Sequence, residues 1–482
     1  MPRTRALVTA VAAALAAATL CSCYTGLHAM PEGTSFEGPL RPARDVRFLA
    51  DTTWTDDGGA RHVHQEIFDA IFGVIRSAER FVLVDMFLWN DFQGEVPETT
   101  RALSAELTEA LIARKRARPE MQIVAISDPV NTVYGGIESK HFRALRDAGI
   151  PVVITLLDRL RDSNPGYSGF WRLFARPLGQ PRGGALPNPF GEGRVNTLSY
   201  LALLNFKANH RKVVIADGGA NGPGAVAIVS SANPHDGSSA HGNAALFFSG
   251  AAVADLLEAE KAVIAFSDGE VPAIILPEEA AADEHPGGAT LQVVTEGAIR
   301  RALLEALGRA GAGDRIDVAV FYLSDRGVIE ALVEARAREA DVRVLLDPNK
   351  DAFGHEKSGV PNRPVAVDLR GGEVDVRWCD THGEQCHAKL LLARYRSGDA
   401  ALILGSANFT RRNLQDLNLE TSVALRGPQT FPALRDAAAW FEKLWMNAPD
   451  RHFSVDYQTY ADPSLRKRFQ YRLEERTGFS TF

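Results

Sequence analysis

The chain contains the same ordered set of short motifs twice, and this internal duplication restricts its possible folds more than any other feature of the sequence. Each half has an Asp-Pro pair, then a His-x-Lys triplet, then a Ser-x-Asn triplet. The motifs are Asp128-Pro129, His210-x-Lys212 and Ser231-x-Asn233 in the first half, and Asp347-Pro348, His387-x-Lys389 and Ser406-x-Asn408 in the second. A matching order of several motifs predicts two structurally similar units in one chain.

Apolar residues around these motifs alternate between helical and strand spacing. A helix over 67–75 and a buried strand over 81–88 in the first half have matching elements in the second half. Alternating helices and strands of these lengths predict an α/β fold with largely parallel pairing. We therefore expect two homologous α/β lobes, residues 51–275 and 286–445, with the active site between them.

Two segments have no counterpart in the duplication. Residues 163–195 of the first lobe interleave aromatic residues with arginines, which is typical of a lid or an interfacial loop near phosphate headgroups, and equally of a surface loop folded onto its own aromatics. A basic-aromatic extension over 446–482 follows the second lobe. In it, Leu465, Phe469 and Leu473 have helical spacing among arginines, which predicts a helix that either packs on the core or contacts anionic lipid.

The N-terminus has the features of a bacterial export signal. Two arginines precede an apolar run over 6–20, which is shorter than the about 20 residues that a membrane-spanning helix needs. The run ends in a sequence similar to a lipoprotein cleavage site before Cys23. We therefore expect a lipoprotein-type signal peptide over 1–22, lipidation of Cys23, a tether over 23–50, and an exported protein anchored at the periplasmic face or the outer membrane. Plain secretion is the alternative.

The duplicated motifs contain the groups that displacement at a phosphodiester needs. A strand directs residues i and i+2 to the same face, so each His-x-Lys triplet presents an imidazole and an ammonium group together. If the two lobes pack about a pseudo-twofold axis, both triplets of each kind converge on one pocket. One imidazole can then attack phosphorus while the other protonates the leaving oxygen, and the lysines and amides hold the phosphate oxygens. No metal ion or other cofactor is required, because the lysines supply the positive charge.

On these residues the sequence resembles the phospholipase D superfamily, and most of all its phosphatidylserine/cardiolipin synthase-like branch. The paired motif of that family is matched by His210-x-Lys212-x4-Asp217 and by His387-x-Lys389. The resemblance implies a two-lobed α/β fold with the site between the lobes, a phosphohistidine intermediate, and transfer to water or an alcohol. It assigns a structural role to Asp217. The residues implied to be catalytic are His210, Lys212, His387, Lys389 and Glu420, and those implied to bind the phosphate are Ser231, Asn233, Ser406 and Asn408.

In this family a carboxylate downstream of each Ser-x-Asn triplet orients a catalytic histidine. Glu420 fills this position in the second half, whereas the position that matches it by counting in the first half is Ala245. The resemblance therefore implies that Glu420 supports His387. His210 would have no carboxylate partner unless another acid, such as Asp236, replaces it.

Two cysteines lie just before the second His-x-Lys triplet. In an exported protein, a disulfide between Cys379 and Cys386 is the favoured interpretation, and it would brace the loop that leads into the His387 strand. The spacing of Cys379, His382, Cys386 and His387 also fits a zinc site. The zinc interpretation is weaker, because the duplicated motif already accounts for His387.

The favoured function is that of a metal-independent phosphodiesterase or phosphatidyltransferase acting on phospholipids, similar to phospholipase D or cardiolipin synthase. We expect a monomer held at a membrane surface by its lipid anchor. One alternative is a secreted nuclease with the same pocket, and the other is a degenerate protein that binds phosphate headgroups without turnover. The net charge of −7, which becomes −9 once the two signal arginines are removed, disfavours the nuclease, because nucleic acids are bound by basic surfaces.

Overall fold

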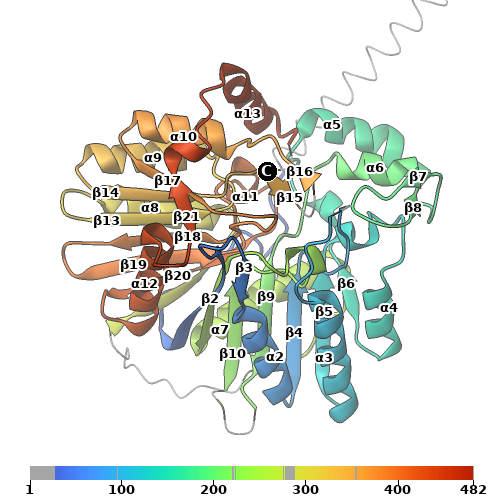
Figure 1. The fold of residues 1–482 in the computed structure, drawn as a ribbon. Helices are drawn as coiled ribbons and strands as arrows, with labels where there is room; N and C mark the ends of the chain where they lie inside the picture. Colours follow the sequence, from blue (N-terminus) through green and yellow to red (C-terminus); the bar gives the residue numbers. More distant parts are fainter. Residues whose placement is uncertain are drawn as a thin grey trace, which may run out of the picture.

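The computed structural model describes residues 28–94, 96–219, 222, 224–274, 276, 288–352, 355–480 and 482. The expected signal peptide and the expected lipidation site at Cys23 lie outside these residues. The described part of the chain forms two mixed α/β lobes packed against each other, which confirms the predicted fold class (Figure 1). In Figure 1 the first lobe is coloured blue to green, and the second is coloured yellow to red.

Each lobe is built on one large sheet. The first sheet has eight strands in the order β3 (Arg61–His64), β2 (Arg44–Thr55), β11 (Asn243–Ser249), β10 (Ala225–Ser230), β9 (Lys212–Asp217), β4 (Phe81–Met86), β5 (Gln122–Ser127) and β6 (Val152–Ile154). The second has nine strands in the order β1 (Arg41–Pro42), β12 (Thr290–Thr295), β20 (Thr421–Pro428), β19 (Asp399–Gly405), β18 (Lys389–Arg394), β13 (Arg315–Val320), β14 (Asp341–Leu346), β17 (Asp375–Cys379) and β21 (Ser454–Asp456).

Consecutive strands of the two sheets correspond one to one, from β2 through β6 in the first sheet and from β12 through β17 in the second. The first lobe therefore begins at residue 44, where β2 begins, and not at residue 51. The expected tether over 23–50 is wrong from residue 41 onward, because β1 joins the second sheet and β2 joins the first. The many polar residues of β2 hide its strand character in the sequence. The extension over 446–482 likewise adds β21 to the edge of the second sheet.

The strand pairing is mostly antiparallel, which corrects the expectation of largely parallel sheets. Within the two large sheets, the parallel pairs are β4–β5, β5–β6, β13–β14 and β14–β17. The strands that carry the His-x-Lys triplets, β9 and β18, pair antiparallel with both of their neighbours. Short loops join β9 to β10 and β18 to β19, and such a loop can join only antiparallel neighbours.

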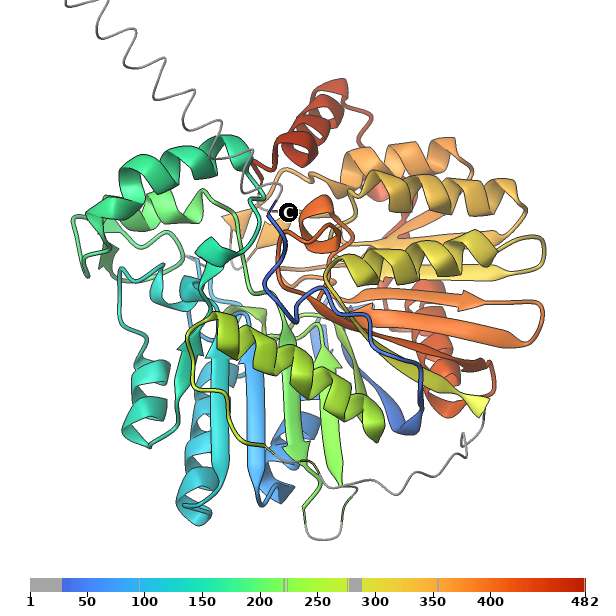
Figure 2. The same cartoon turned by 180° about the vertical axis from the view of Figure 1, so that it is seen from behind.

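Helices cover the outer faces of the sheets, and an apolar core fills the space between the inner faces. The outer helices are α2 (Ile67–Ser77), α3 (Leu103–Ala117) and α4 (Lys140–Asp147) in the first lobe, and α8 (Gly297–Arg309), α9 (Arg326–Ala337) and α10 (Asn362–Gly371) in the second. The shared inner core includes Leu83 and Ile215 of one sheet with Leu390 and Leu404 of the other. It also takes residues from α7 (Ala251–Phe266) and α12 (Pro432–Met446); Figure 2 shows α7 lying across the first sheet. The two lobes therefore fold around one core.

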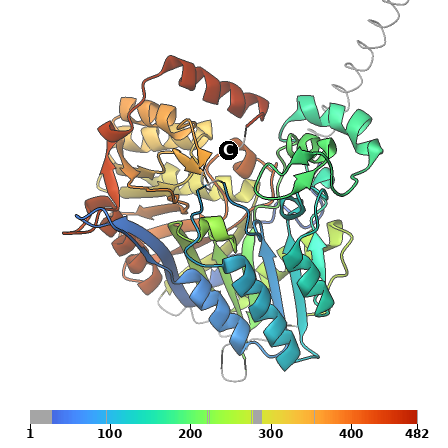
Figure 3. The same ribbon diagram turned by 45° about the vertical axis from the view of Figure 1, so that its right-hand side comes forward.

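The segments without a counterpart gather at one end of the molecule. The insertion forms α5 (Pro165–Phe170), the helical turns η3 (Trp171–Ala175) and η4 (Arg176–Leu178), the hairpin of β7 (Leu186–Pro187) and β8 (Arg194–Val195), and then α6 (Thr197–Leu203). The C-terminal helix α13 (Leu465–Thr477) lies at the same end as α5 (Figure 3). A short hairpin of β15 (Asp351–Ala352) and β16 (His355–Glu356) and the short helix α11 (Arg411–Leu414) complete the fold. In the described part of the chain, no helix is both long and apolar enough to cross a bilayer.

Candidate active site

One cavity of about 520 Å³ brings the two halves of the duplicated motif together. Its volume is typical of a site for a small molecule. His210 and His387 both line it, and so do Asn233 and Asn408. The rest of the lining is mainly aromatic, with Phe87, Phe190, Phe206, Phe321, Tyr322 and Phe482 among its residues. The two His-x-Lys triplets therefore meet at one site, as the pseudo-twofold arrangement predicts.

The backbone of each histidine is docked against the opposite lobe. The His210 N–H donates to the carbonyl of Leu419 at 2.9 Å, and the His387 N–H donates to the carbonyl of Gly242 at 2.7 Å. Each histidine lies immediately before its strand, β9 or β18. The strands of both lobes thus hold the two imidazoles in equivalent positions on the two sides of the cavity.

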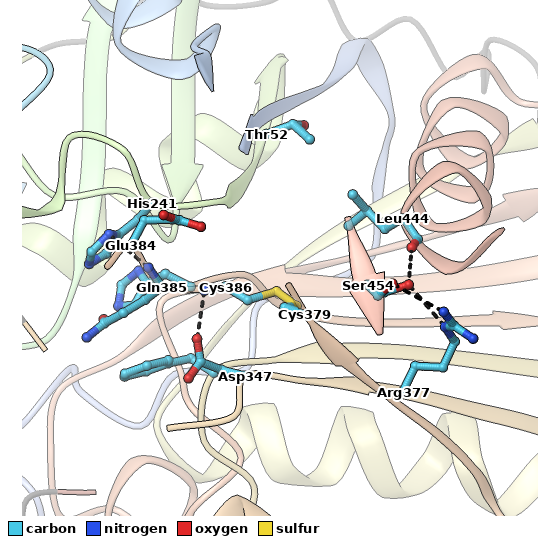
Figure 4. Close-up of a disulfide and its surroundings, with 12 residues drawn as sticks. Thr52, His241, Asp347, Arg377, Cys379, Glu384, Gln385, Cys386, Leu444 and Ser454 are labelled. Atoms are coloured by element: carbon cyan, nitrogen blue, oxygen red, sulfur yellow. Dashed lines mark hydrogen bonds between the residues drawn. A yellow bond between two sulfur atoms is a disulfide. The ribbon is translucent and has the colours of Figure 1, made fainter. Parts of the chain in front are cut away.

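The duplicated Asp-Pro pairs fix the residue before each histidine. A carboxylate oxygen of Asp128 accepts the backbone N–H of Asn209 at 2.7 Å, and one of Asp347 accepts that of Cys386 at 2.8 Å (Figure 4). Burial raises the pKa of Asp128 to about 7 and the pKa of Asp347 to about 6. The sequence shows that these acids are repeated, and the structure shows that both hold the backbone at the entry to a histidine.

The partners of the two imidazoles are exchanged between the lobes, which corrects the assignment made from the sequence. Glu420 lies 2.9 Å from Nδ1 of His210, in the opposite lobe, and does not support His387. Nδ1 of His387 lies 3.1 Å from Oδ1 of Asn243 instead. Asp236, considered above as a substitute acid, accepts hydrogen bonds from helix α3. One imidazole therefore has a carboxylate partner and the other has a neutral amide.

The wrong assignment has a structural cause. The loop between the Ser-x-Asn triplet and the histidine partner is two residues shorter in the first lobe: 12 positions separate Ser231 from Asn243, whereas 14 separate Ser406 from Glu420. Counting from the second half therefore leads to Ala245, which is buried in the outer core of the first lobe. Asn243 is the first-lobe residue that corresponds to Glu420. It presents a neutral amide to its histidine, whereas Glu420 presents a carboxylate.

The serines of the Ser-x-Asn triplets are not among the residues that line the cavity, and their expected phosphate-binding role stays a prediction. The Ser231 hydroxyl donates to Oδ1 of Asn243 at 3.0 Å, and the Ser406 hydroxyl donates to the Glu420 carboxylate. Strand alternation would place serine and asparagine on one face, but β10 and β19 both end before the triplet. The serines therefore orient the histidine partners, while the asparagines face the cavity.

Lys212 and Lys389 are fully buried and make equivalent contacts. Nζ of each lysine donates to the carbonyl of the histidine two residues before it, at 2.5 Å in both lobes. An aromatic ring lies beside each pair. The Phe87 ring is 4.7 Å from the first imidazole and 5.1 Å from the first Nζ, and the Phe321 ring is 5.1 Å from the second imidazole and 5.3 Å from the second Nζ. Neither phenylalanine was predicted as a site residue from the sequence, although each directly follows an equivalent strand.

Burial sets the charge state of the site. It lowers the pKa of His210 to about 4, and the Glu420 carboxylate opposes this shift. Burial, together with the nearby Lys389 charge, holds the pKa of His387 well below its ordinary value. Burial lowers the pKa of Lys212 to about 7, and it also lowers the pKa of Lys389. At neutral pH both imidazoles are therefore uncharged in the free protein, and His210 has the partner that favours its protonated form.

A buried ion network links the two lobes next to the histidines. Arg211 donates to Glu296 at 2.7 Å and to Glu260 at 3.1 Å, and all three side chains are fully buried. Glu296 also accepts the backbone N–H of Glu420 at 3.0 Å. The network therefore fixes the backbone that carries the partner of His210. In the sequence this network is indicated only by Arg211, which lies between His210 and Lys212. The second triplet has Ala388 at the same position.

Asp217 has the structural role implied by the resemblance. Its carboxylate accepts three consecutive backbone N–H groups, at positions 79–81, where the chain enters β4. In the second lobe the equivalent strand ends at Arg394, which pairs with Asp317 at 2.6 Å. The second lobe thus uses a different contact at this point.

Cys379 and Cys386 form a disulfide, as expected from the sequence (Figure 4). The bond closes the loop that leads into His387. Both thiols are used in this bond, so neither is available as a ligand for the alternative zinc site over 379–387. Within the described ranges, no group of three or more histidine, cysteine, aspartate and glutamate side chains is arranged to hold a metal ion.

Comparisons with known proteins found one matching family and several proteins of similar structure. Residues 303–445 match the family described as "Cardiolipin synthase, PLD-like domain". The phosphatidylserine synthase of Haemophilus influenzae Rd KW20 has a similar structure, with a TM-score of 0.53 and 11% sequence identity over 91% of this chain and 95% of that chain. Nuc, a phospholipase D family member from Salmonella typhimurium, aligns with a TM-score of 0.27 and 18% identity over 35% of this chain and 99% of that chain. A search of curated proteins found no match.

The matched segment covers the second His-x-Lys triplet, its Ser-x-Asn triplet and Glu420. The first lobe repeats the strand order of the second and supplies the first triplet to the same cavity. The fold is shared with a phosphatidylserine synthase along nearly the whole of both chains. The second lobe is therefore similar to a cardiolipin synthase, PLD-like domain, and the chain as a whole has a fold similar to that of a phosphatidylserine synthase.

Proposed function

We propose that the protein is a metal-independent phosphodiesterase or phosphatidyltransferase that acts on phospholipids through a phosphohistidine intermediate. The observation that carries this proposal is the pair of histidines in one cavity, each held at Nδ1 by a partner from the opposite lobe. Because Nδ1 is engaged in both rings, Nε2 is the nitrogen that can react. One ring can attack phosphorus while the other exchanges a proton with the departing and entering oxygens.

The two imidazoles have different partners, and this difference supports a division of roles. A protonated imidazole is stabilised beside the Glu420 carboxylate, so His210 is the general acid. His387 donates its Nδ1 proton to the neutral Asn243 amide and keeps a lone pair on Nε2, so it is the nucleophile. The ammonium groups of Lys212 and Lys389 balance the negative charge of the phosphate.

The reaction then has two steps. The bound phosphate anion, together with Glu420, favours the protonated form of His210, which then carries a proton on Nε2 before the reaction begins. Nε2 of His387 forms a bond to phosphorus while the bond from phosphorus to the leaving oxygen breaks, and Nε2 of His210 gives that oxygen its proton. In the second step His210 takes a proton from water or an alcohol, and the oxygen of that molecule displaces His387 from phosphorus. Hydrolysis and transfer to an alcohol thus differ only in whether water or the alcohol attacks phosphorus in the second step.

A lipid substrate is supported by the walls of the cavity. Aromatic side chains from both lobes and from the C-terminus surround the two histidines, and such walls suit the apolar part of a phospholipid better than a nucleic-acid backbone. The overall net charge of −7 also disfavours nucleic acid. Lipidation of Cys23, which we propose from the sequence, would keep the enzyme at the membrane surface where this substrate is found.

Product analysis tests this proposal. The purified protein is incubated with vesicles of mixed phospholipids, with and without a primary alcohol, and the lipids are followed by mass spectrometry. We expect phosphatidic acid without the alcohol and a phosphatidyl-alcohol with it, and EDTA should leave turnover unchanged. Cleavage of DNA with the lipids intact would instead identify a nuclease. Lipid binding without any product would identify a headgroup-binding protein.

The pKa of Lys212 predicts how substrate capture depends on pH. The ammonium group is charged below about pH 7 and loses its charge above it, so kcat/KM should fall by about tenfold per pH unit on the alkaline side. At saturating substrate the bound phosphate anion favours the charged lysine, so kcat should fall less. Steady-state kinetics on a soluble phosphodiester, at pH values below and above 7, measures both kcat/KM and kcat. In the Lys212→Arg variant the side chain stays charged across this pH range, so the fall in kcat/KM should disappear. A fall that persists unchanged would show that Lys212 does not cause it.

A further inference from the structure

The C-terminal helix α13 exposes the apolar residues that an amphipathic helix ordinarily buries. Leu465, Phe469 and Leu473 are 77%, 71% and 50% exposed, whereas Tyr471 of the same helix is fully buried. These three residues lie at i, i+4 and i+8, so they form one continuous stripe. A continuous exposed apolar stripe on a soluble protein indicates a surface that binds a partner.

The exposed face of α13 is also basic. Its exposed residues are Leu465, Arg466, Arg468, Phe469, Arg472, Leu473, Arg476 and Thr477. Both glutamates of the helix, Glu474 and Glu475, are only partly exposed. The arginines stand out because the chain as a whole has a net charge of −7. Two of them share one acid on the neighbouring helix, since Arg468 and Arg472 both pair with Asp368.

The insertion has a second exposed apolar patch at the same end of the molecule. Phe170, Leu173, Phe174 and Leu178 are 43%, 39%, 45% and 71% exposed. They belong to α5, η3 and η4, and Arg176 lies among them. Figures 1 and 3 show α5 and α13 projecting from the same end of the molecule, with the C-terminus between them.

Both patches are connected to the walls of the active-site cavity. Phe190 from the insertion and Phe482 from the C-terminus line the cavity. The chain that follows α13 contacts the first lobe, because the rings of Phe206 and Phe479 are 5.4 Å apart. Phe206 also lines the cavity. The two exposed patches therefore belong to the segments that border the site of chemistry.

We propose that α13 and the α5–η4 segment form one docking surface for an anionic phospholipid bilayer. Leucine and phenylalanine side chains enter the interface, while the arginines pair with lipid phosphates. Docking in this orientation places the cavity against the membrane, where a lipid can enter it without crossing water. The inference rests on the proposed function for the choice of a lipid surface, and it adds the part of the molecule that recognises that surface.

A fluorescent label on α13 tests docking without any need for turnover. The full chain with Phe469→Cys is labelled with an environment-sensitive dye and mixed with vesicles of phosphatidylcholine, alone or with an equal amount of phosphatidylglycerol. We expect a blue shift of the dye emission that is larger with phosphatidylglycerol and weaker at high salt. Met446→Cys on α12, at a side chain that is 69% exposed and apolar, is the matched control and should show no shift. The unsubstituted chain measures labelling of other thiols.

A variant of the apolar stripe separates docking from chemistry. Leu465→Ser, Phe469→Ser and Leu473→Ser together should lower turnover of vesicle lipids by about tenfold or more, while turnover of a short-chain soluble phospholipid stays unchanged. No blue shift at Phe469→Cys, or an equal shift at Met446→Cys, would overturn the docking proposal. If instead the shift appears and neither lipid is turned over, docking stands and the proposed function fails.

Discussion

Replacing His387 with alanine is expected to abolish turnover of every phosphodiester, whereas replacing His210 should spare the first step for substrates whose leaving group needs no proton. Without the Nε2 of His387 no bond to phosphorus can form, so the loss should reach about 10³-fold or more for lipids and for p-nitrophenyl phosphodiesters alike. Without His210 the alkoxide of a lipid headgroup leaves unprotonated, which costs about 10²- to 10⁴-fold. p-Nitrophenolate is a stable anion and should leave nearly as fast as before. Initial rates on lipids and the burst of p-nitrophenolate in the first turnover measure both effects.

A rapid quench under alkaline conditions, followed by peptide mapping, gives an independent reading of the same roles. The phosphoryl group should be found on the peptide that contains His387, and the His210→Ala variant should accumulate it with an activated substrate. The opposite pattern, with the label on His210 and activated substrates spared by His387→Ala, would reverse the assignment. Because both side chains line a cavity, thermal unfolding of each variant serves as the control for folding.

Glu420→Gln is expected to lower lipid turnover by about 10²-fold while leaving the fold intact. The glutamine has the shape of the glutamate and can still accept from His210 Nδ1 and Asn413, and it can donate to the Ser406 hydroxyl. It lacks the negative charge that stabilises protonated His210. The loss should therefore be large for lipids and small for the first-turnover release of p-nitrophenolate. A loss of the same size for both would show that Glu420 acts by holding the ring in place and not through its charge.

The reciprocal change provides a sharper version of this experiment. Asn243→Asp on the wild-type background gives His387 a carboxylate partner as well. Combined with Glu420→Gln, it moves the single negative charge from one imidazole to the other. If charge assigns the roles, the double variant should carry its phosphoryl label on His210. Retention of the label on His387 would mean that other features of the cavity choose the nucleophile.

The repeated motifs predicted the fold class and the meeting of the two triplets, because both depend on local patterns that occur twice. They did not predict where the first lobe begins, since β2 is too polar to be recognised as a strand by its apolar residues. They also suggested parallel sheets, because the helices and strands alternate around β4 and β5. Pairing depends on the length of each connection as well, and the short loops beside β9 and β18 make those strands antiparallel.

The chemistry of the site was predicted less completely than its position. The pairing of Glu420 with His210 depends on which lobe faces which, and no pattern within one lobe contains that information. A difference of two residues in loop length was enough to direct attention to Ala245 and away from Asn243. The disulfide was predicted because Cys379 and Cys386 are close in sequence and suit an exported protein. Phe87 and Phe321 were missed, since aromatic residues after buried strands are common in any core.

The exchange of histidine partners between lobes also bears on how such a chain can evolve. In a dimer of two identical copies, one codon would specify the partner of both histidines, and any substitution would alter both rings at once. Here the two partners are encoded separately, at positions 243 and 420, and they hold an amide and an acid. Because both copies lie in one chain, each position can change alone. Two histidines with unequal partners are therefore possible in a duplicated chain and impossible in a dimer of identical copies.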